Sequence, residues 1–282
     1  MNEEKSFSKT SINWYPGHMA KTKREIKEKI DLIDIVYEVI DARMPYSSRI
    51  IDLDEIIKDK PRIMIFTKYD LCDKKVTDKF IEDYEKKYKV LKVDLKSNTN
   101  ITNNIISLTN ELLSDLNQKR MAKGLSKRTY RALVVGVPNV GKSTLINRLA
   151  GRNVAKTGNQ AGVTKSLSWI RINKVIELLD SPGILWPKIN DEIVGYNLAS
   201  LTSIKEEILD KEEIAKYILL FLSQNYPQIL KDKYGILDID TSDIIETYDI
   251  IAKRRGALLK GGVSDYDKVY AIVINDWSKA WN

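Results

Sequence analysis

The sequence predicts a three-layer α/β domain with a mostly parallel sheet, followed by a smaller all-α domain. Over the first two thirds of the chain, short apolar runs alternate with longer amphipathic stretches, as in a parallel sheet covered by helices. A glycine-rich loop, Gly136–Ser143, joins one such run to a helical stretch. Beyond Trp186–Pro187 the strand-like runs stop and only helical periodicity remains. These three observations fix the fold class.

The predicted elements of the first domain follow one another in regular order. The strands are short apolar runs at Ile35–Ile40, Arg62–Phe66, Val90–Val93, Arg131–Val135, Leu167–Ile172 and Val175–Leu179. The helices repeat apolar residues at helical spacing near Met19–Ile30, Ile50–Lys58, Lys74–Tyr88, Ile101–Leu116 and Thr144–Ala150.

In the last third of the chain, helical periodicity covers Lys211–Leu222 and Asp243–Ala252. Ser264, with Asp267 three residues later, predicts the cap of a final helix. We place the domain boundary near Trp186–Asn190, which gives domains of residues 1–188 and 189–282, with about the first 11 residues disordered.

Composition excludes several classes of protein. No apolar run approaches the length of a membrane span, and the N-terminus lacks the apolar core of a signal peptide. The single cysteine, Cys72, cannot form an internal disulfide. We therefore expect a cytoplasmic protein that has no membrane partner. As a separate expectation, which does not rest on composition, the free protein is a monomer.

The net charge of +7 is unevenly distributed. Residues 190–282 contain 11 Lys and Arg against 16 Asp and Glu, a net charge of −5, so the first 189 residues carry the remaining +12. Residues 116–176 contain 13 Lys and Arg and no acidic residue. Six of these cations precede the glycine-rich loop: Lys119, Arg120, Lys123, Lys127, Arg128 and Arg131. Such a surface suits a nucleic acid, although a solvated basic face without a partner is the alternative.

The glycine-rich loop fits the phosphate-binding pattern G-x-x-x-x-G-K-[ST]. Its backbone N–H groups and the N-terminus of the following helix favour a bound polyphosphate. Lys142 is expected to reach the outer phosphates, and Ser143 to bind Mg²⁺. The expected contacts with the nucleotide come from Pro138, Asn139, Val140, Gly141, Lys142, Ser143 and Thr144. The sequence therefore predicts a nucleoside triphosphate site.

A second metal-binding and phosphate-sensing segment follows the next strand. Asp180 ends that strand and is a candidate magnesium ligand, and the backbone N–H of Gly183 is placed to sense the γ-phosphate. Thr164, in the loop between, offers a hydroxyl as a further magnesium ligand. Neither pattern alone indicates a nucleotide site. Both become informative because a phosphate loop precedes them in the chain.

The base is expected to be read by loops that precede the phosphate loop. One carboxylate can accept hydrogen bonds from both N1–H and the 2-amino group of guanine, and Asp70 in Thr67-Lys68-Tyr69-Asp70 is placed for this role. The Lys68 stem is expected to lie along the ring. A neighbouring loop formed by Asp94, Leu95 and Lys96 offers a backbone N–H to guanine O6. The alternative for Thr67–Asp70 is an ordinary turn at a strand end.

Taken together, these motifs resemble those of the translation-factor-related GTPases, but in rotated order. The base-reading loops come first, and the phosphate loop, Thr164 and Asp180–Gly183 follow, as in circularly permuted GTPases. The segments Asn13–Ala20, Asp41–Arg49, Asp180–Pro187 and Arg254–Gly262 closely resemble the RbgA (YlqF) branch, the ribosome biogenesis GTPase A family.

The resemblance implies a Mg²⁺-dependent GTPase that assembles the large (50S) ribosomal subunit and is stimulated by that particle. It also implies that the C-terminal helical domain helps to dock on rRNA. Two features depart from the family pattern: Thr67 stands where most GTPases have asparagine, and the chain ends at Asn282 without the expected basic tail. We therefore expect more of the RNA contact to lie on the acid-free stretch.

The residue that positions water in many GTPases, a glutamine directly after Asp-x-x-Gly, is replaced by Ile184, and Leu185 follows. His18 is the expected catalytic substitute, since imidazole can orient water and accept a proton near neutral pH; the alternative is that it caps the helix starting at Met19. Asn139 is expected to coordinate K⁺, as in similar potassium-activated GTPases, unless it only forms the turn. With Lys142, these are the catalytic candidates.

Three further readings stay open at this point. One is a permuted GTPase with another RNA-linked role, and another is a GTP-gated RNA-binding module in which hydrolysis is incidental. The third is an ATPase or a kinase.

Overall fold

The computed structural model describes residues 17–97, 100–155, 167–185, 189, 191–204, 210–241 and 243–279, with side chains from Met19 onward in the first helix. The chain divides into two compact units, Met1–Gly195 and Tyr196–Asn282. The division lies within helix α6, Glu192–Ser200. Within these residues, no helix combines the length and apolar character that crossing a membrane requires.

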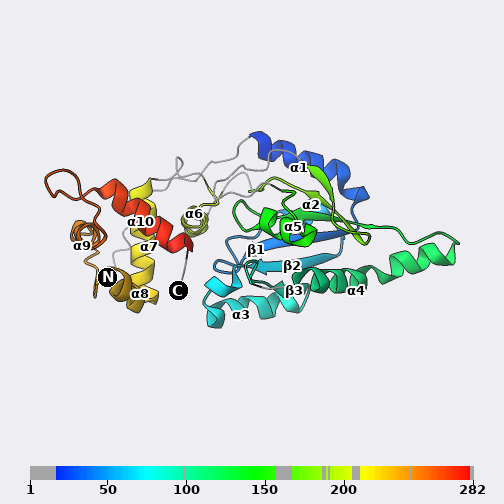
Figure 1. Ribbon diagram of the computed structural model, residues 1–282, viewed down its shortest axis with the longest axis horizontal. Helices are drawn as coiled ribbons and strands as arrows, with labels where there is room; N and C mark the ends of the chain where they lie inside the picture. The colour runs from blue at the N-terminus through cyan, green and yellow to red at the C-terminus, as the bar shows by residue number, and fades with distance from the viewer. Residues whose placement is uncertain are drawn as a thin grey trace. The chain divides into compact units, whose positions relative to one another are not determined.

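The first unit is built on a six-stranded sheet with the strand order β3-β2-β1-β4-β6-β5 (Figure 1). All neighbouring strands pair in parallel except the edge strand β5, which runs antiparallel to β6. The strands are β1 Ile35–Asp41, β2 Arg62–Thr67, β3 Lys89–Lys92, β4 Tyr130–Val135, β5 Ser168–Arg171 and β6 Ile176–Asp180. β1 and β2 are buried along their whole length, as strands covered on both faces should be.

Helices cover both faces of this sheet. They are α1 Gly17–Lys29, α2 Leu53–Ile57, α3 Lys74–Glu85, α4 Ile101–Ala122 and α5 Lys142–Ala150, with short 3₁₀ turns at Ile30–Leu32 and Tyr69–Leu71. Successive strand residues point to opposite faces. On one face, Ile40 and Phe66 pack with Ile81 of α3. On the other face, the Tyr37 hydroxyl lies 2.7 Å from the Thr109 hydroxyl of α4.

Helices α1 and α2 lie on the same face of the sheet as α3, and α5 lies on the face covered by α4. Arg62, on the same face of β2 as Phe66, forms an ion pair with Asp54 of α2, and Lys23 of α1 forms one with Asp52, the residue before α2. Helices α1, α2 and α3 therefore share one face. Helix α5 packs against α4 on the other, which confirms the predicted three layers.

The second unit is helical in its described part. After α6 it contains α7 Lys211–Asn225, α8 Pro227–Tyr234, α9 Ile245–Arg255 and α10 Tyr266–Lys279. Trp277 of α10 anchors the packing: its indole N–H donates to the Ser200 hydroxyl over 3.0 Å, and its ring meets Phe221 of α7 edge-on, with centroids 5.6 Å apart. The sequence periodicity missed α6 and α8, which are only nine and eight residues long.

The predicted cap of the last helix was wrong in detail. The Ser264 hydroxyl donates to the Asp249 carboxylate over 2.6 Å and does not cap α10. Asp265, one residue later, accepts a hydrogen bond from the backbone N–H of Lys268. A carboxylate that is already next to the helix start outcompetes a hydroxyl that has a tertiary partner.

Candidate nucleotide-binding and hydrolysis site

The predicted site loops gather at one edge of the sheet. Strands β1, β2, β3, β4 and β6 are parallel, so their carboxyl ends and the loops that follow them meet there. The chain moves outward in one direction from β1 to β3 and in the other direction from β4. The loop after β4 therefore lies at the topological switch point, where open α/β sheets bind ligands.

The phosphate loop lies close against the neighbouring strand and the loop after β6. A Cβ on Gly136 would lie 2.5 Å from the Val39 carbonyl oxygen, and a Cβ on Gly183 would lie 2.7–2.8 Å from atoms of Pro138. Only glycine fits at either position without moving backbone. The loop after β6 is also bonded to the phosphate loop, because the backbone N–H of Ile184 donates to the Gly136 carbonyl over 3.2 Å.

Lys142 is the first residue of α5 and is buried. Its ammonium donates to the carbonyl oxygens of Gly136 and Val137 over 3.0 and 2.8 Å. Burial lowers the pKa of this lysine, and the nearby Asp180 carboxylate opposes that shift. The cation thus lies inside the phosphate loop.

The Asp180 carboxylate gives the strongest indication that this site binds a cation. Its side chain is buried at the end of β6, and among the described residues its Oδ1 atom has no hydrogen-bond partner. Burial raises the pKa of Asp180, against the opposing effect of Lys142. A buried, unpaired carboxylate oxygen is costly, and a cation bound beside it would remove that cost.

The donor set fits magnesium. Ser143, half-buried in the first turn of α5, offers a hydroxyl, and Asp180 offers the unpaired oxygen. The described residues contain no cluster of three or more His, Cys, Asp or Glu. Mg²⁺ needs none at such a site, because substrate phosphates and water complete its coordination. The third predicted ligand, Thr164, lies outside the described residues.

The position that follows Asp180-x-x-Gly183 is closed to water. Ile184 and Leu185 are fully buried. Ser181, in the same turn, donates its hydroxyl to the Val134 carbonyl over 2.7 Å and fixes the loop on β4. A side chain at position 184 therefore points into the core, so the apolar residue there reflects the direction of the side chain as well as its chemistry.

The loop that follows β2 is joined to the phosphate loop. The buried Thr67 hydroxyl lies 2.5 Å from the Val140 carbonyl oxygen and 3.1 Å from that of Ile40. The Lys68 ammonium donates to the Asn139 carbonyl over 2.8 Å. Asp70 is half-buried in the 3₁₀ turn, and its carboxylate makes no hydrogen bond to a described residue. Thr67 and Lys68 thus fix the two loops to each other, and Asp70 stays available to a base.

The loop after β3 completes this edge. Asp94 shapes it by accepting hydrogen bonds from the Lys96 backbone N–H, over 2.8 Å, and from the Ser97 hydroxyl; this second bond lowers the pKa of Asp94. The side chain of Leu95 lies 3.2 Å from the place where a Cβ of Gly141 would be. Arg148 of α5 donates to the Lys96 carbonyl over 3.2 Å. The structure therefore brings Asp94, Leu95 and Lys96 beside the phosphate loop.

A buried charge cluster at the end of β1 was missed by motif reading. Arg43 donates to the Asp41 carboxylate through Nε over 2.9 Å and through Nη2 over 2.7 Å. Lys68 donates to the same carboxylate over 2.8 Å. Burial alone would raise the pKa of Asp41, but Arg43 and Lys68 hold it well below its usual range. The sequence signals were a carboxylate directly at a strand end and the resemblance of Asp41–Arg49 to the RbgA branch, and neither predicted the ion pairs.

For the remaining predicted residues, the structure gives no side-chain contact that assigns their roles. Thr144, in the first turn of α5, is exposed. His18 belongs to the first turn of α1, but its side chain is not among those the structure describes. Asn139 has a left-handed backbone with φ of 61°, a conformation that asparagine tolerates better than most residues.

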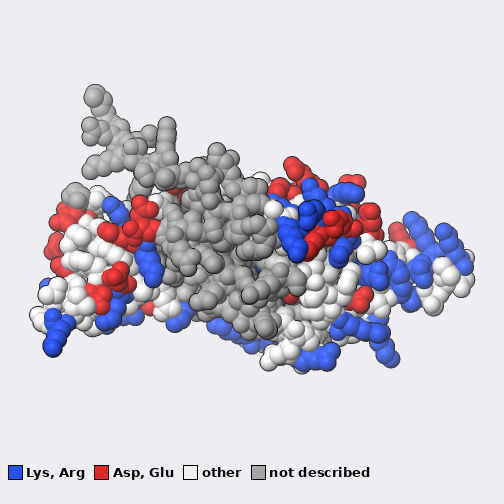
Figure 2. Space-filling model, turned by 90° about the horizontal axis from the view of Figure 1, so that it is seen from above, with Lys and Arg blue, Asp and Glu red and all other residues white. Residues whose placement is uncertain are grey.

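The basic residues that precede the phosphate loop fall into two groups. Arg128 forms an ion pair with Asp34, and Arg131 forms one with Glu177. Lys119, Lys123 and Lys127 are exposed and have no ion-pair partner among the described residues. Figure 2 shows Lys and Arg gathered at this end of the first unit, where α4 ends.

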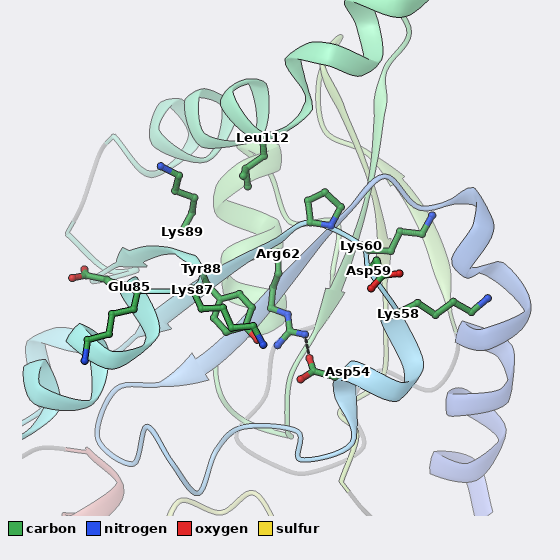
Figure 3. Close-up of a pocket in the computed structure, with 12 residues that line it drawn as sticks. Asp54, Lys58, Asp59, Lys60, Arg62, Glu85, Lys87, Tyr88, Lys89 and Leu112 are labelled. Carbon is green, nitrogen blue, oxygen red and sulfur yellow. Dashed lines mark hydrogen bonds and ion pairs between the residues drawn. The ribbon is translucent and has the colours of Figure 1, made fainter.

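A separate cavity of about 680 Å³ lies at the amino ends of β2 and β3, away from the site loops (Figure 3). Its lining mixes lysines with the carboxylates Asp54, Asp59 and Glu85. Arg62 pairs with Asp54 and with the buried Glu38, and its guanidinium lies 4.8 Å from the centre of the Tyr88 ring. The cavity lies at the opposite ends of the strands from the phosphate loop, so it is not the nucleotide site.

Comparison with known proteins agrees with this geometry. A family model described as a 50S ribosome-binding GTPase matches residues 131–253, starting in the strand that leads into the phosphate loop. Ribosome biogenesis GTPase A of Priestia megaterium is 47% identical over 94% of this chain and 92% of its own length. The Thermotoga maritima protein of that name is 32% identical over 94% of this chain and 89% of its length.

A solved structure supports the same assignment. The crystal structure of GNP-bound YlqF from T. maritima aligns with a TM-score of 0.62 at 28% identity and covers 92% of this chain and 94% of that one. The family excludes the ATPase and kinase readings, and the loops predicted to bind the base, Thr67–Asp70 and Asp94–Lys96, precede the phosphate loop in the chain. The chain belongs to the ribosome biogenesis GTPase A family of circularly permuted GTPases, and it hydrolyses GTP in ribosome biogenesis.

Proposed function

We propose that this GTPase is an assembly factor for the large (50S) ribosomal subunit and that the subunit stimulates its hydrolysis. The observation that carries the proposal is the burial of Ile184. The loop after β6 can hold the phosphate end of GTP but has no side chain at this position that reaches water. The attacking water must therefore be positioned by another group, and docking on the particle would bring that group into place. Such an enzyme works in the cytoplasm, where its substrate particle is made.

In this proposal the loops divide the work on GTP. Asp70 accepts hydrogen bonds from guanine, and the loop of Asp94, Leu95 and Lys96 closes over the base. Lys142 neutralises charge on the outer phosphates, and the Gly183 backbone N–H donates to the γ-phosphate. Ser143, Asp180 and Thr164 would hold Mg²⁺, which neutralises phosphate charge when bound. The unpaired Oδ1 atom of Asp180 supports this set.

His18 is the group we propose for positioning water. It lies in the first turn of α1, and α1 is held on α2 by the ion pair between Lys23 and Asp52. An imidazole can orient water and accept its proton near neutral pH. Movement of the first turn of α1 on the particle would then switch hydrolysis on.

The test is GTP hydrolysis with and without purified large subunits, using wild type and His18→Ala. We expect strong stimulation of wild type and loss of stimulation in His18→Ala, with GTP affinity retained in both. Lys21→Ala, which removes an exposed neighbour on α1, is the matched control and should be stimulated like wild type. Full stimulation of His18→Ala would refute the role of His18. No stimulation of wild type would refute the assembly-switch proposal itself.

We also propose that Asn139 holds K⁺ during hydrolysis. Its amide oxygen is a suitable ligand type for an alkali cation, and a cation here would neutralise charge that develops on the phosphates. The left-handed backbone of Asn139 equally suits a residue that only forms the turn. Stimulated rates in K⁺ and in Na⁺ separate the two roles: a K⁺ preference that Asn139→Ala abolishes supports the site, and equal rates of wild type in both salts exclude it.

A second candidate function is a GTP-gated RNA-binding module in which hydrolysis is incidental. The exposed lysines at the end of α4, which have no ion-pair partner among the described residues, favour it. Co-sedimentation with large subunits, in a non-hydrolysable GTP analogue and in GDP, addresses this function. Nucleotide-dependent binding without stimulated hydrolysis would favour the module over the assembly GTPase.

A further inference from the structure

Helix α4 extends beyond the core that it covers. Its buried residues are Ile101, Ile105, Thr109, Leu113 and Asn117, a repeat of four that places one side of the helix on the sheet. After Asn117 no residue of α4 is buried, although the helix continues to Ala122. Figure 1 shows this end running past the strands before the chain returns to β4. We call residues 118–127 the basic tip.

The basic tip is ordered by hydrogen bonds at its base and its end. The Asn117 side chain accepts from the Arg128 backbone N–H over 3.2 Å. At the end, the backbone N–H groups of Gly124 and Leu125 donate to the Met121 and Arg120 carbonyls over 2.9 and 3.0 Å. With Gly124 at φ of 71°, these bonds close the helix in the manner of a glycine C-cap. The backbone that carries the charged side chains therefore has a defined shape before any partner arrives.

The charge of the tip is uncompensated. Within it are Lys119, Arg120, Lys123 and Lys127, and no acidic residue. Among the described residues none of the three lysines has an ion-pair partner, and Arg120 donates only to the Ser126 carbonyl. Cations elsewhere on the unit are often paired, as are Lys86 with Asp83 and Lys92 with Asp78.

The fold itself does not require this arrangement. Lys119 and Lys123 are four residues apart on one helix face, where like charges destabilise a helix by about 0.2–0.5 kcal/mol. The helix dipole favours cations in and next to the last turn, which accounts for Lys119, Arg120 and the C-cap residue Lys123 but not for Lys127, four residues farther on. An ordered projection that buries little and carries one sign of charge is best explained by an anionic partner.

We propose that the basic tip of α4 is a docking surface for the phosphate backbone of RNA. The proposal deepens the proposed function, on which the choice of RNA rests. Lys119 and Lys123 lie about 6 Å apart along the helix axis at 1.5 Å per residue, so both can contact one phosphate strand. Because lysines act as point charges, such contacts position the protein without reading sequence.

The test compares two double variants of the full-length protein that remove the same charge from the same helical spacing. Lys119→Gln/Lys123→Gln alters the basic tip. Lys75→Gln/Lys79→Gln is the matched control, because these lysines are also exposed and four residues apart, but α3 contains acidic residues as well. Binding of a labelled 20-base-pair RNA duplex is measured by fluorescence anisotropy over a range of KCl concentrations.

We expect the tip variant to bind RNA on the order of tenfold more weakly, and the slope of log K against log salt to fall by about 2, since each phosphate contact contributes about 0.9. The control variant should bind like wild type, and GTP affinity should be unchanged in both. Equal losses in the two variants, or no loss in the tip variant, would overturn the proposal. Stimulation of GTP hydrolysis by large subunits is measured in parallel. If wild type is not stimulated, the assembly function is refuted. Weaker RNA binding by the tip variant alone would still support the basic tip as an RNA-binding surface.

Discussion

The ammonium of Lys68 donates a hydrogen bond to the carbonyl oxygen of Asn139 over 2.8 Å, which joins the loop after β2, where we propose that the base is bound, to the phosphate loop. The same ammonium donates to Asp41 at the end of β1. The two nucleotide loops and the central strand are therefore connected through one cation.

Replacing Lys68 with methionine keeps the stem but removes this connection. A hydrogen bond to a charged group contributes about 1.5–3 kcal/mol, so we expect GDP affinity to fall on the order of tenfold or more. Titration with a fluorescent GDP analogue measures the change. Lys75→Met, on the exposed face of α3, should bind GDP like wild type; a normal affinity in Lys68→Met would contradict the connecting role.

Asp41→Asn should destabilise the first unit strongly. Arg43 and Lys68 would both lose the buried carboxylate to which they donate, and breaking a buried ion pair in this way costs about 3–5 kcal/mol. Chemical unfolding at neutral pH measures the change. In Asp83→Asn, which breaks the exposed pair with Lys86, the loss should be far smaller, because water screens this pair. Similar losses in the two variants would show that the cluster is not stabilising.

The stability difference between wild type and Asp41→Asn should depend on pH. The folded pKa of Asp41 lies below its unfolded value of 3.8, because Arg43 and Lys68 outweigh the effect of burial. The stabilisation is therefore fully present above the unfolded pKa and is lost as the pH falls through the folded pKa. The difference in unfolding free energy between wild type and Asp41→Asn should shrink below pH 3.8. A difference that grows on acidification would contradict this assignment.

Installing the glutamine that many GTPases use should fail here. In Ile184→Gln the amide would replace a fully buried side chain, at a cost of about 1–3 kcal/mol if it stays unpaired. We expect lower stability and no gain in intrinsic hydrolysis, measured by phosphate release without subunits. Ile184→Met, which stays apolar, should keep most of the stability. A clear rise in intrinsic hydrolysis in Ile184→Gln would show that position 184 faces the water after all.

Gly183→Ala should separate the two nucleotide states. The added Cβ would lie within 2.8 Å of Pro138 backbone atoms, so the loops must move apart where the γ-phosphate is expected. We predict a larger loss of affinity for a non-hydrolysable GTP analogue than for GDP, measured by calorimetry. Gly151→Ala, which has open space around it but a positive φ, should lower stability without this difference. Equal losses for both nucleotides would place Gly183 away from the γ-phosphate.

Much of the fold could be predicted because its signals are local. The strand of residues 130–135, the glycine loop and the following helix form one continuous segment, and the apolar runs that mark the other strands are equally short. Only the ends of elements and two short helices, α6 and α8, were missed. The capping role of Ser264 was wrong because its hydroxyl is taken by Asp249, which no local pattern reveals.

The sequence predicted which residues belong to the candidate site better than it predicted what those residues contact. Motif spacing selected Thr67 and Lys68, and the Lys68 stem was expected to lie along the guanine ring. The structure shows that both side chains bond to the phosphate loop, across 73 and 71 residues of sequence. The charges on Arg128 and Arg131 looked available in the sequence and are paired in the fold.

The sequence by itself determined the order of the motifs, and with it the permutation, because a motif's position in the chain needs no coordinates. It also determined that Ile184 cannot hydrogen-bond water. Only the tertiary structure decided where that side chain points, which cations remain unpaired, and that Asp41 shares Lys68 with the phosphate loop. These properties depend on contacts between segments distant in the chain, and such contacts exist only once the sheet has brought the ends of its strands together.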